Sequence, residues 1–325
     1  MTKKLSARDF ILAHIFEILI VLLVILLGLT TTGFFSFRNI IGIFRNMSMI
    51  GVLAFGITVA IICGVIDLSV PSTVALTGVV IGLCANTLPG LWGIHINLAM
   101  LIGLIIMIIV AILVGLANAY FVSRFQMPAF IATMANMYVL FGLAAIISGG
   151  FPVIGFPSWY SVVGAGTLFG LIPTPAIVLT IMFLFTFVLM NHTKFGRSVY
   201  AVGGNMEAAR LSGINIKSVR RRTFIFVQIC AVISGIMLSS QVMSGSFNFA
   251  GDWAFHAISC VVIGGTAFTG GKGRVWGTFI GLFFYGLVTN AMTLLNVSQF
   301  TQHVLRGLLI LAAVIINSYR VDSKQ

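Results

Sequence analysis

Long apolar runs fill most of this chain, and only short polar connections separate them. Many of these runs reach about 18 or more residues, the length that a helix needs to cross a bilayer. Hydrophobic residues make up 59% of the sequence and the mean hydropathy is +1.14, so a water-soluble fold would expose too much apolar surface. The sequence predicts an all-α polytopic membrane protein. Because the connections are too short for a further domain, residues 1–325 are expected to form one transmembrane domain.

Windows of about 20 apolar residues give ten expected spans. They lie near residues 15–34, 47–66, 69–87, 98–122, 128–149, 173–191, 223–243, 254–269, 276–294 and 302–319. The Gly- and Pro-rich connection 149–175 is compatible with a re-entrant or interfacial segment. The basic N-terminus and first apolar run resemble a signal peptide, but no small-residue cleavage motif follows, so we interpret this run as an uncleaved first span.

Basic residues cluster between the apolar runs. A formal net charge of +12 would suggest nucleic-acid binding in a soluble protein, but the positive-inside rule explains this clustering better, and no nucleic-acid partner is expected. The connection at about 192–222 carries seven Lys or Arg residues, which places it in the cytoplasm. Alternation of ten spans then puts both termini and fifteen of the eighteen basic residues inside, leaving Arg38, Arg45 and Arg306 outside.

This basic connection contains the signals of a short helix. Asn205 is a favoured N-cap, Glu207 lies in the first turn, where a negative charge suits the helix dipole, and Gly213 supplies a stop. Between them stand four helix formers, Ala208, Ala209, Arg210 and Leu211. A helix of about two turns is not stable alone in water. It therefore needs a partner, which is either the lipid headgroups beside a membrane-parallel linker or a cleft on a cytoplasmic protein.

Polar side chains inside the apolar runs are candidates for a translocation pathway. Asp67 is costly in hydrocarbon and is expected to face protein, water or a helix break, while Ser69 and Pro71 fit the cap and first turn of a new helix. Asp67 and Ser69 thus belong either to a pathway or to a polar turn at the membrane face. Other side chains suit a polar solute or equally contacts between helices: Asn118, Asn136, Gln228, Gln241, Ser244, Asn248 and Asn290.

The sequence shows no site for chemistry. The segment GTAFTGGKG fails the P-loop pattern, because Thr266 and Gly273 stand where that pattern needs Gly and Ser or Thr. Its glycines are instead expected to allow close helix packing and a tight cytoplasmic turn. The five histidines and six acids form no catalytic or metal-binding pattern, and the four single cysteines are expected to be small buried hydrophobes. We expect no enzyme activity, cofactor or metal, so the energy for transport must come from a partner or an ion gradient.

Three stretches together resemble the ribose-type permeases of bacterial ABC importers. GGNMEAARLSGI, from Gly203, is similar to the cytoplasmic coupling segment of that family. GVIDLSVPS, residues 64–72, is similar to its G-G-I-D-L-S-V-G-S signature, and AISCVVIGGTAFTGGKGRVWGTFIG, residues 257–281, to a third conserved segment. The motifs keep the order and spacing of the family. The departures are Val65 and Pro71, which replace two signature glycines, and Ala254 and His256, which replace an acidic pair.

The resemblance implies a permease that imports a monosaccharide or similar small polar solute across the bacterial cytoplasmic (inner) membrane. The implied partners are a cytoplasmic ABC ATPase, an extracytoplasmic sugar-binding protein and a second permease chain, identical or not. The resemblance assigns ATPase coupling to Gly203, Gly204, Asn205, Glu207, Ala208, Ala209, Arg210 and Gly213. The alternative is an ion-coupled secondary transporter, for which Asp67 and Asp252 are the only candidate coupling acids.

Overall fold

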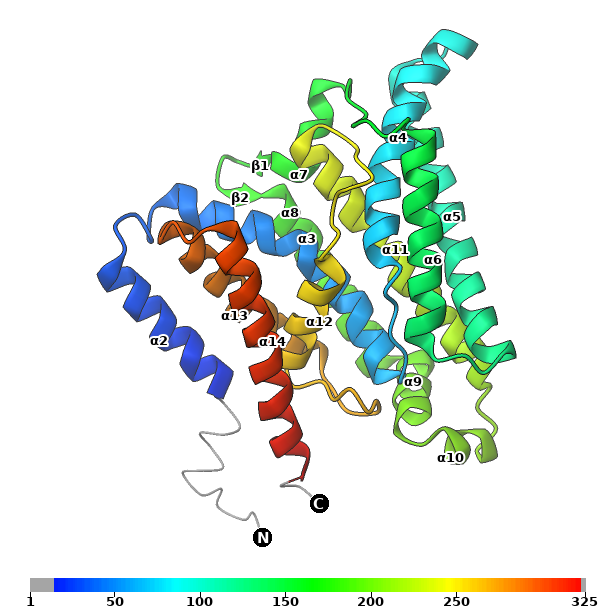
Figure 1. The fold of residues 1–325 in the computed structure, drawn as a ribbon, viewed down its shortest axis with the longest axis vertical. Coiled ribbons are helices and arrows are strands. Elements are labelled where there is room, and N and C mark those ends of the chain that lie inside the picture. The colour runs from blue at the N-terminus through cyan, green and yellow to red at the C-terminus, as the bar shows by residue number, and fades with distance from the viewer. Residues whose placement is uncertain (1–14, 323–325) are drawn as a thin grey trace.

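The computed structural model describes residues 15–322, which form a bundle of helices (Figure 1). The longer helices are α2 (Ile15–Thr30), α3 (Phe37–Ile62), α4 (Val70–Trp92), α5 (Ile96–Arg124), α6 (Ala129–Ile147), α8 (Thr174–His192), α11 (Ile216–Val242), α13 (Val275–Leu294) and α14 (Gln299–Asp322). The shorter elements are η1 (Ser158–Tyr160), α7 (Ser161–Ala165), the paired strands β1 (Thr167–Leu168) and β2 (Ile172–Pro173), α9 (Lys194–Gly204), α10 (Met206–Leu211) and α12 (Trp253–Ile263).

Seven helices of the described part are long and apolar enough to cross a membrane, namely α3, α4, α5, α6, α8, α11 and α13. The prediction of a polytopic helical membrane protein is therefore confirmed, but ten full spans are not. The expected span 254–269 contains only the 11 residues of α12, which extend about 17 Å at 1.5 Å per residue, roughly half of the hydrocarbon core. Gly265 follows with a φ of +83°, which ends the helix. The end helices α2 and α14 are not among the seven.

Helices α3 and α11 occupy the centre of the bundle. α11 packs against α3, α4 and α5, and α3 also packs against α8, α12 and α13. The half of α3 from Met47 to Ile62 is buried apart from Ile50, and small residues allow this packing, since a Cβ on Gly56 would lie 3.1 Å from Cys230 Cβ. The cysteines are free, and three are buried while Cys84 is half-buried, in agreement with their predicted packing role.

The backbone loses its helical form at two places inside the bundle. Residues 63–69 connect α3 to α4, and residues 243–252 connect α11 to α12. Figure 1 shows the first connection leading from the end of α3 to α4 and the second leading from the end of α11 to α12, and Asp67, Ser69 and Ser246 are buried within them. Irregular backbone at membrane depth is tolerated where protein surrounds it. These breaks explain why the expected spans 47–66 and 254–269 do not correspond to complete helices.

The connection 149–175 is folded against α11. It contains η1, α7 and the β1–β2 hairpin. Val153 and Gly245 exchange backbone hydrogen bonds of 2.7 and 2.8 Å, and the N–H of Gly164 donates to Ser240 Oγ at 2.7 Å. Tyr160 shares a 2.8 Å hydrogen bond with Ser239, and burial raises the pKa of Tyr160 to about 12, so its hydroxyl stays protonated at neutral pH.

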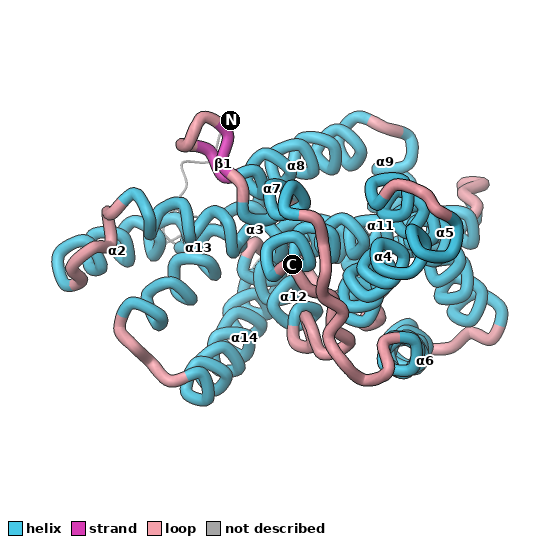
Figure 2. The backbone as a smooth tube through the Cα atoms, turned by 90° about the horizontal axis from the view of Figure 1, so that it is seen from above, coloured by secondary structure: helices cyan, strands magenta, loops and turns pink. Residues whose placement is uncertain are grey.

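The arrangement of the helices separates two groups along the bundle. Seen from above, α4, α5, α6 and α11 gather on one side and α2 and α13 on the other, with α3 running between them (Figure 2). Figure 1 shows that α2 begins and α14 ends toward the end of the molecule that carries α9 and α10. The predicted coupling segment therefore projects from one end of the bundle.

Candidate functional site

The segment between α8 and α11 folds as two short helices joined by one residue. Asn205 ends α9, because its N–H donates to the carbonyl of Ala201 at 3.1 Å. The same residue begins α10, because its side-chain oxygen accepts from the N–H of Ala208 at 2.9 Å. At the other end, Gly213 has a φ of +81°, and the N–H groups of Gly213 and Ile214 donate to the carbonyls of Arg210 and Ala209. This is a Schellman cap, so the predicted start and stop of the helix are confirmed.

The two alanines of α10 differ in their exposure. Ala209 is 3% exposed and packs against its own chain, whereas Ala208 is exposed. Glu207 and Arg210 form an exposed ion pair of 2.6 Å. Leu211 is 79% exposed and Met206 is also exposed. The sequence analysis did not name either of them as a contact residue. Apolar residues within a charged connection are a signal that could have identified them. The surface open to a partner thus consists of Met206, Glu207, Ala208, Arg210 and Leu211.

The three recognised motifs meet where the end of α9 contacts the end of α3 and the turn before α13. A Cβ on Gly203 would lie 1.7 Å from the carbonyl oxygen of Ile62 and 2.7 Å from the nitrogen of Gly271, so only glycine fits there. The N–H of Gly271 donates to Ile62 at 2.8 Å. Tyr200 of α9 donates to the carbonyl of Gly273 at 3.0 Å, and burial raises the pKa of Tyr200, which keeps this donor protonated. The end of α9 therefore contacts both the end of α3 and the turn before α13.

A buried polar network surrounds the break before α4. One carboxylate oxygen of Asp67 accepts from the backbone N–H and the hydroxyl of Ser69, the first at 2.9 Å. The other accepts from Asn118 at 3.1 Å and Gln228 at 2.8 Å. Asn136 donates to Asn118. Asp67, Ser69, Asn118 and Gln228 are completely buried. Both oxygens of the Asp67 side chain therefore meet hydrogen-bond donors inside the bundle, which offsets part of the cost of burying this polar group.

The structure brings together only part of the predicted pathway set. Asp67, Ser69, Asn118, Asn136 and Gln228 share the network, but Gln241, Ser244, Asn248 and Asn290 do not. Asn290 forms a reciprocal amide pair with Asn39 of α3, at 2.7 and 3.2 Å, and Gln241 donates to Asn46 at 3.4 Å. Ser69 precedes α4 as expected and Pro71 lies in its first turn. The Ser69 hydroxyl makes no cap hydrogen bond, because its oxygen accepts instead from the side-chain amides of Asn118 and Gln228.

A second polar group lies where α12, α13 and α14 meet, and the sequence interpretation did not single it out. A cavity of about 590 Å³ is lined by Thr293, Asn296, Val297, Gln299, Gln302, His303 and Arg306. Arg306 donates to Gln302 at 3.0 Å, and His303 lies 3.5 Å from Asp252. In the described part, Arg306 Nε and Nδ1 of the neighbouring His256 are buried without hydrogen-bond partners. Polar residues at 299, 302, 303 and 306 share one helix face, which is a signal available from the sequence.

Comparison with known proteins gives consistent results. Residues 39–314 match the family described as "Branched-chain amino acid transport system / permease component". The chain is 31% identical to the ribose import permease protein of Haemophilus influenzae, over 98% of this chain and 97% of that protein. It is 34% identical to the Bacillus subtilis ribose import permease protein, over 91% of this chain and 89% of that protein. It is 35% identical to the L-arabinose transport system permease protein of Escherichia coli, over 90% of this chain and 86% of that protein. No solved structure matches.

These relatives are permease subunits and not enzymes, and in such importers ATP hydrolysis belongs to a partner ATPase. The match covers most of the chain and agrees with its seven apolar helices. The resemblance seen in the three motifs is thereby confirmed, and the chain belongs to the family of ABC-importer permeases, multi-pass proteins of the bacterial inner membrane.

Proposed function

We propose that this permease imports a monosaccharide such as a pentose, supplied by an extracytoplasmic sugar-binding protein and driven by a cytoplasmic ABC ATPase. The names of its ribose and arabinose relatives support this substrate class. The cavity beside α14 offers amide, imidazole and guanidinium groups that suit a hydroxylated solute. The ion-coupled alternative has little support, because Asp67, the one completely buried acid among the residues whose burial the structure describes, already accepts hydrogen bonds from four donors.

The observation that carries the proposal is the surface of α10. Its caps hold a helix of only six residues in place, and its exposed side includes Leu211 and Met206, which are costly to leave in water. An ATPase cleft that covers these residues would bury that apolar area. Glu207, Ala208 and Arg210 would lie inside the same contact, whereas Ala209, Gly203 and Gly213 would support it from within this chain.

The test is a change at the exposed alanine of α10. Ala208→Trp should prevent co-purification of the ATPase and reduce uptake of labelled ribose or arabinose by cells to below about one tenth, since filling a fitted cleft costs about 1–3 kcal/mol or more. The matched control is Ala135→Trp, the same substitution at an exposed alanine of α6, which should still co-purify with the ATPase. Normal ATPase binding by Ala208→Trp, or sugar transport by the chain alone in ion-loaded vesicles, would contradict the proposal.

We also propose that the chain crosses the membrane ten times with both termini in the cytoplasm, counting α2, α14 and the broken crossing through α12. A second permease chain would complete the pore. Asp67, Ser69, Asn118 and Asn136 would hold the break before α4 beside the pathway. Gln241, Asn248 and Asn290, in or near the connections at the opposite end from α10, would lie closer to its outer mouth.

A further inference from the structure

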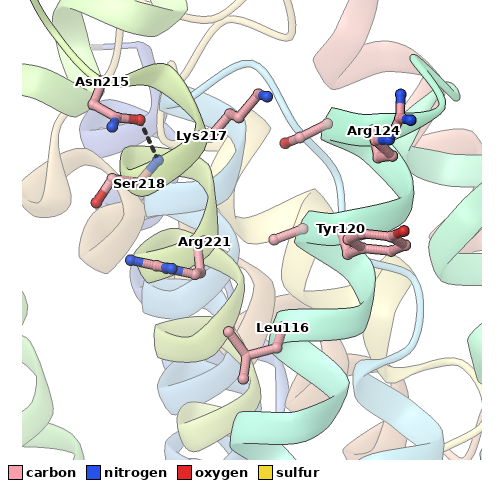
Figure 3. A pocket seen from close by; sticks show the side chains of 9 residues that line it. Leu116, Tyr120, Arg124, Asn215, Lys217, Ser218 and Arg221 are labelled. Carbon is pink, nitrogen blue, oxygen red and sulfur yellow. Dashed lines mark hydrogen bonds between the residues drawn. The ribbon is translucent and has the colours of Figure 1, made fainter.

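A cavity opens between α5 and α11 at the end of the bundle that carries α10. Its volume is about 470 Å³, and it is lined by Leu116, Ala119, Tyr120, Ser123, Arg124, Asn215, Lys217, Ser218 and Arg221. The two helices are in close contact below it, where a Cβ on Gly115 would lie 2.7 Å from the Cα of Ile225. They separate toward the end of α5, which leaves the cavity between them (Figure 3).

The lining of this cavity carries positive charge without a neutralising acid. Arg124, Lys217 and Arg221 contribute three cations, and none of the nine lining residues is an Asp or Glu. Within residues 15–322, none of these three side chains forms a hydrogen bond or an ion pair. In Figure 3 the Lys217 side chain extends toward the end of α5, Arg124 stands at that end, and Arg221 points away from α5. Lys217 and Arg124 therefore dominate the charge at the mouth.

Two further groups favour an anion at this place. The hydroxyl of Ser123 lines the cavity, is buried and has no hydrogen-bond partner. The cavity also adjoins the first turn of α11, a helix of 27 residues in which Asn215 caps only the N–H of Ser218, at 3.0 Å. The remaining N–H groups of that turn and the helix dipole attract negative charge. A phosphate oxygen could thus receive donors from Lys217, Ser123 and the backbone.

The apolar surroundings distinguish a lipid from a free phosphate. Leu116 and Tyr120 of the lining continue a row of exposed side chains along α5, formed by Ile105, Ile109 and Leu113. These residues recur every three or four positions, so they share one face of the helix. A cationic cavity at the end of an apolar stripe matches an amphipathic anion. We propose that the cavity binds the headgroup phosphate of an anionic phospholipid, whose acyl chains lie along this face of α5.

Such a lipid would act on the helix that leads away from α10. Gly213 caps α10 and α11 begins at Ile216, so only a short connection separates the docking helix from the lipid-binding turn. A phosphate bound by Lys217 fixes this turn relative to α5. The bound lipid would thereby hold the connection in place while α10 engages a partner.

The experiment measures lipid binding by the purified full chain in neutral detergent. Labelled phosphatidylglycerol is displaced by unlabelled phosphatidylglycerol, phosphatidylcholine, glycerol phosphate or inorganic phosphate. Phosphatidylglycerol should compete at least about tenfold better than the other three. Lys217→Gln and Arg124→Gln should each weaken its binding about fivefold, since one basic side chain near the surface contributes about that factor. Lys217→Arg, which keeps the charge, should bind like the wild type.

The matched control is Arg222→Gln, which removes a neighbouring exposed cation that does not line the cavity and should change binding by less than about twofold. Equal competition by phosphatidylcholine, or unchanged binding by the Lys217→Gln and Arg124→Gln double variant, would refute the lipid site. Equal competition by inorganic phosphate would show a free-anion site, and displacement of the lipid by the ATPase would show that the partner occupies the cavity; either overturns the proposal. Because transport is not measured, these outcomes leave the proposed import function untouched.

Discussion

At the scale of single residues, Asp67 makes the sharpest prediction. Its two oxygens accept four hydrogen bonds, from the N–H and hydroxyl of Ser69 and from the amides of Asn118 and Gln228. Asp67→Asn would turn one acceptor into a donor that faces other donors, which should cost about 1–3 kcal/mol of stability. The measurement is the midpoint of thermal unfolding in detergent. The control is Glu207→Gln, the same chemical change at an exposed ion pair, which should cost about 0–1 kcal/mol of stability. Equal shifts of the unfolding midpoint in the Asp67→Asn and Glu207→Gln variants would refute this role of the network.

The same scale shows what sequence alone could decide. Asn205 and Gly213 were predictable as the ends of α10, because capping depends on local backbone geometry. The direction of Ala209 was not, since both alanines have the same propensity, and only packing against the rest of the chain buries one of them. Likewise an acid in an apolar sequence predicted a special environment for Asp67. The partners Asn118 and Gln228 lie 51 and 161 residues away, so no local pattern could identify them.

At the scale of elements, the junction of α9 with α3 predicts a difference between two adjacent glycines. Gly203→Ala places a methyl group 1.7 Å from the carbonyl oxygen of Ile62, so α9 must move away from α3. For Gly204→Ala the nearest atom outside the local helix is the Cα of Gly271, at 3.9 Å, which is ordinary contact. We expect Gly203→Ala to lower sugar uptake at least about tenfold and to destabilise the chain by about 1–3 kcal/mol, while Gly204→Ala stays near wild type. Uptake normalised to the amount of permease in the membrane tests this, and equal uptake by both variants would disprove it.

Helices were predictable as elements where the apolar run was continuous. Each of the ten expected spans contains at least part of a helix, but hydropathy does not distinguish a helix from an extended segment buried at the same depth. Residues 243–252 and α12 illustrate this, because α12 has 11 residues and the connection before it lies partly within the bundle. Within this connection, Gly245 exchanges its backbone hydrogen bonds with the distant Val153. Such a tertiary contact leaves no periodic signal in the sequence.

At the scale of the whole molecule, the proposed ten crossings predict which side each connection occupies. Cysteines introduced at Ser36, Ser158 and Ser298, all exposed in the connections between the long helices, should react with a membrane-impermeant thiol reagent in intact cells. A cysteine at Ser212, in the α10 cap, should react only after the cells are opened. In a separate protease assay, tags fused before Met1 and after Gln325 should likewise be cleaved only after the cells are opened. The background is low, because Cys63, Cys230 and Cys260 are buried and Cys84 can be replaced by Ser. The seven long helices alone do not determine the sides of the termini, since these depend on whether α2 and α14 also cross. Protection of one tag and cleavage of the other in intact cells would show an odd number of crossings and would contradict the proposed topology.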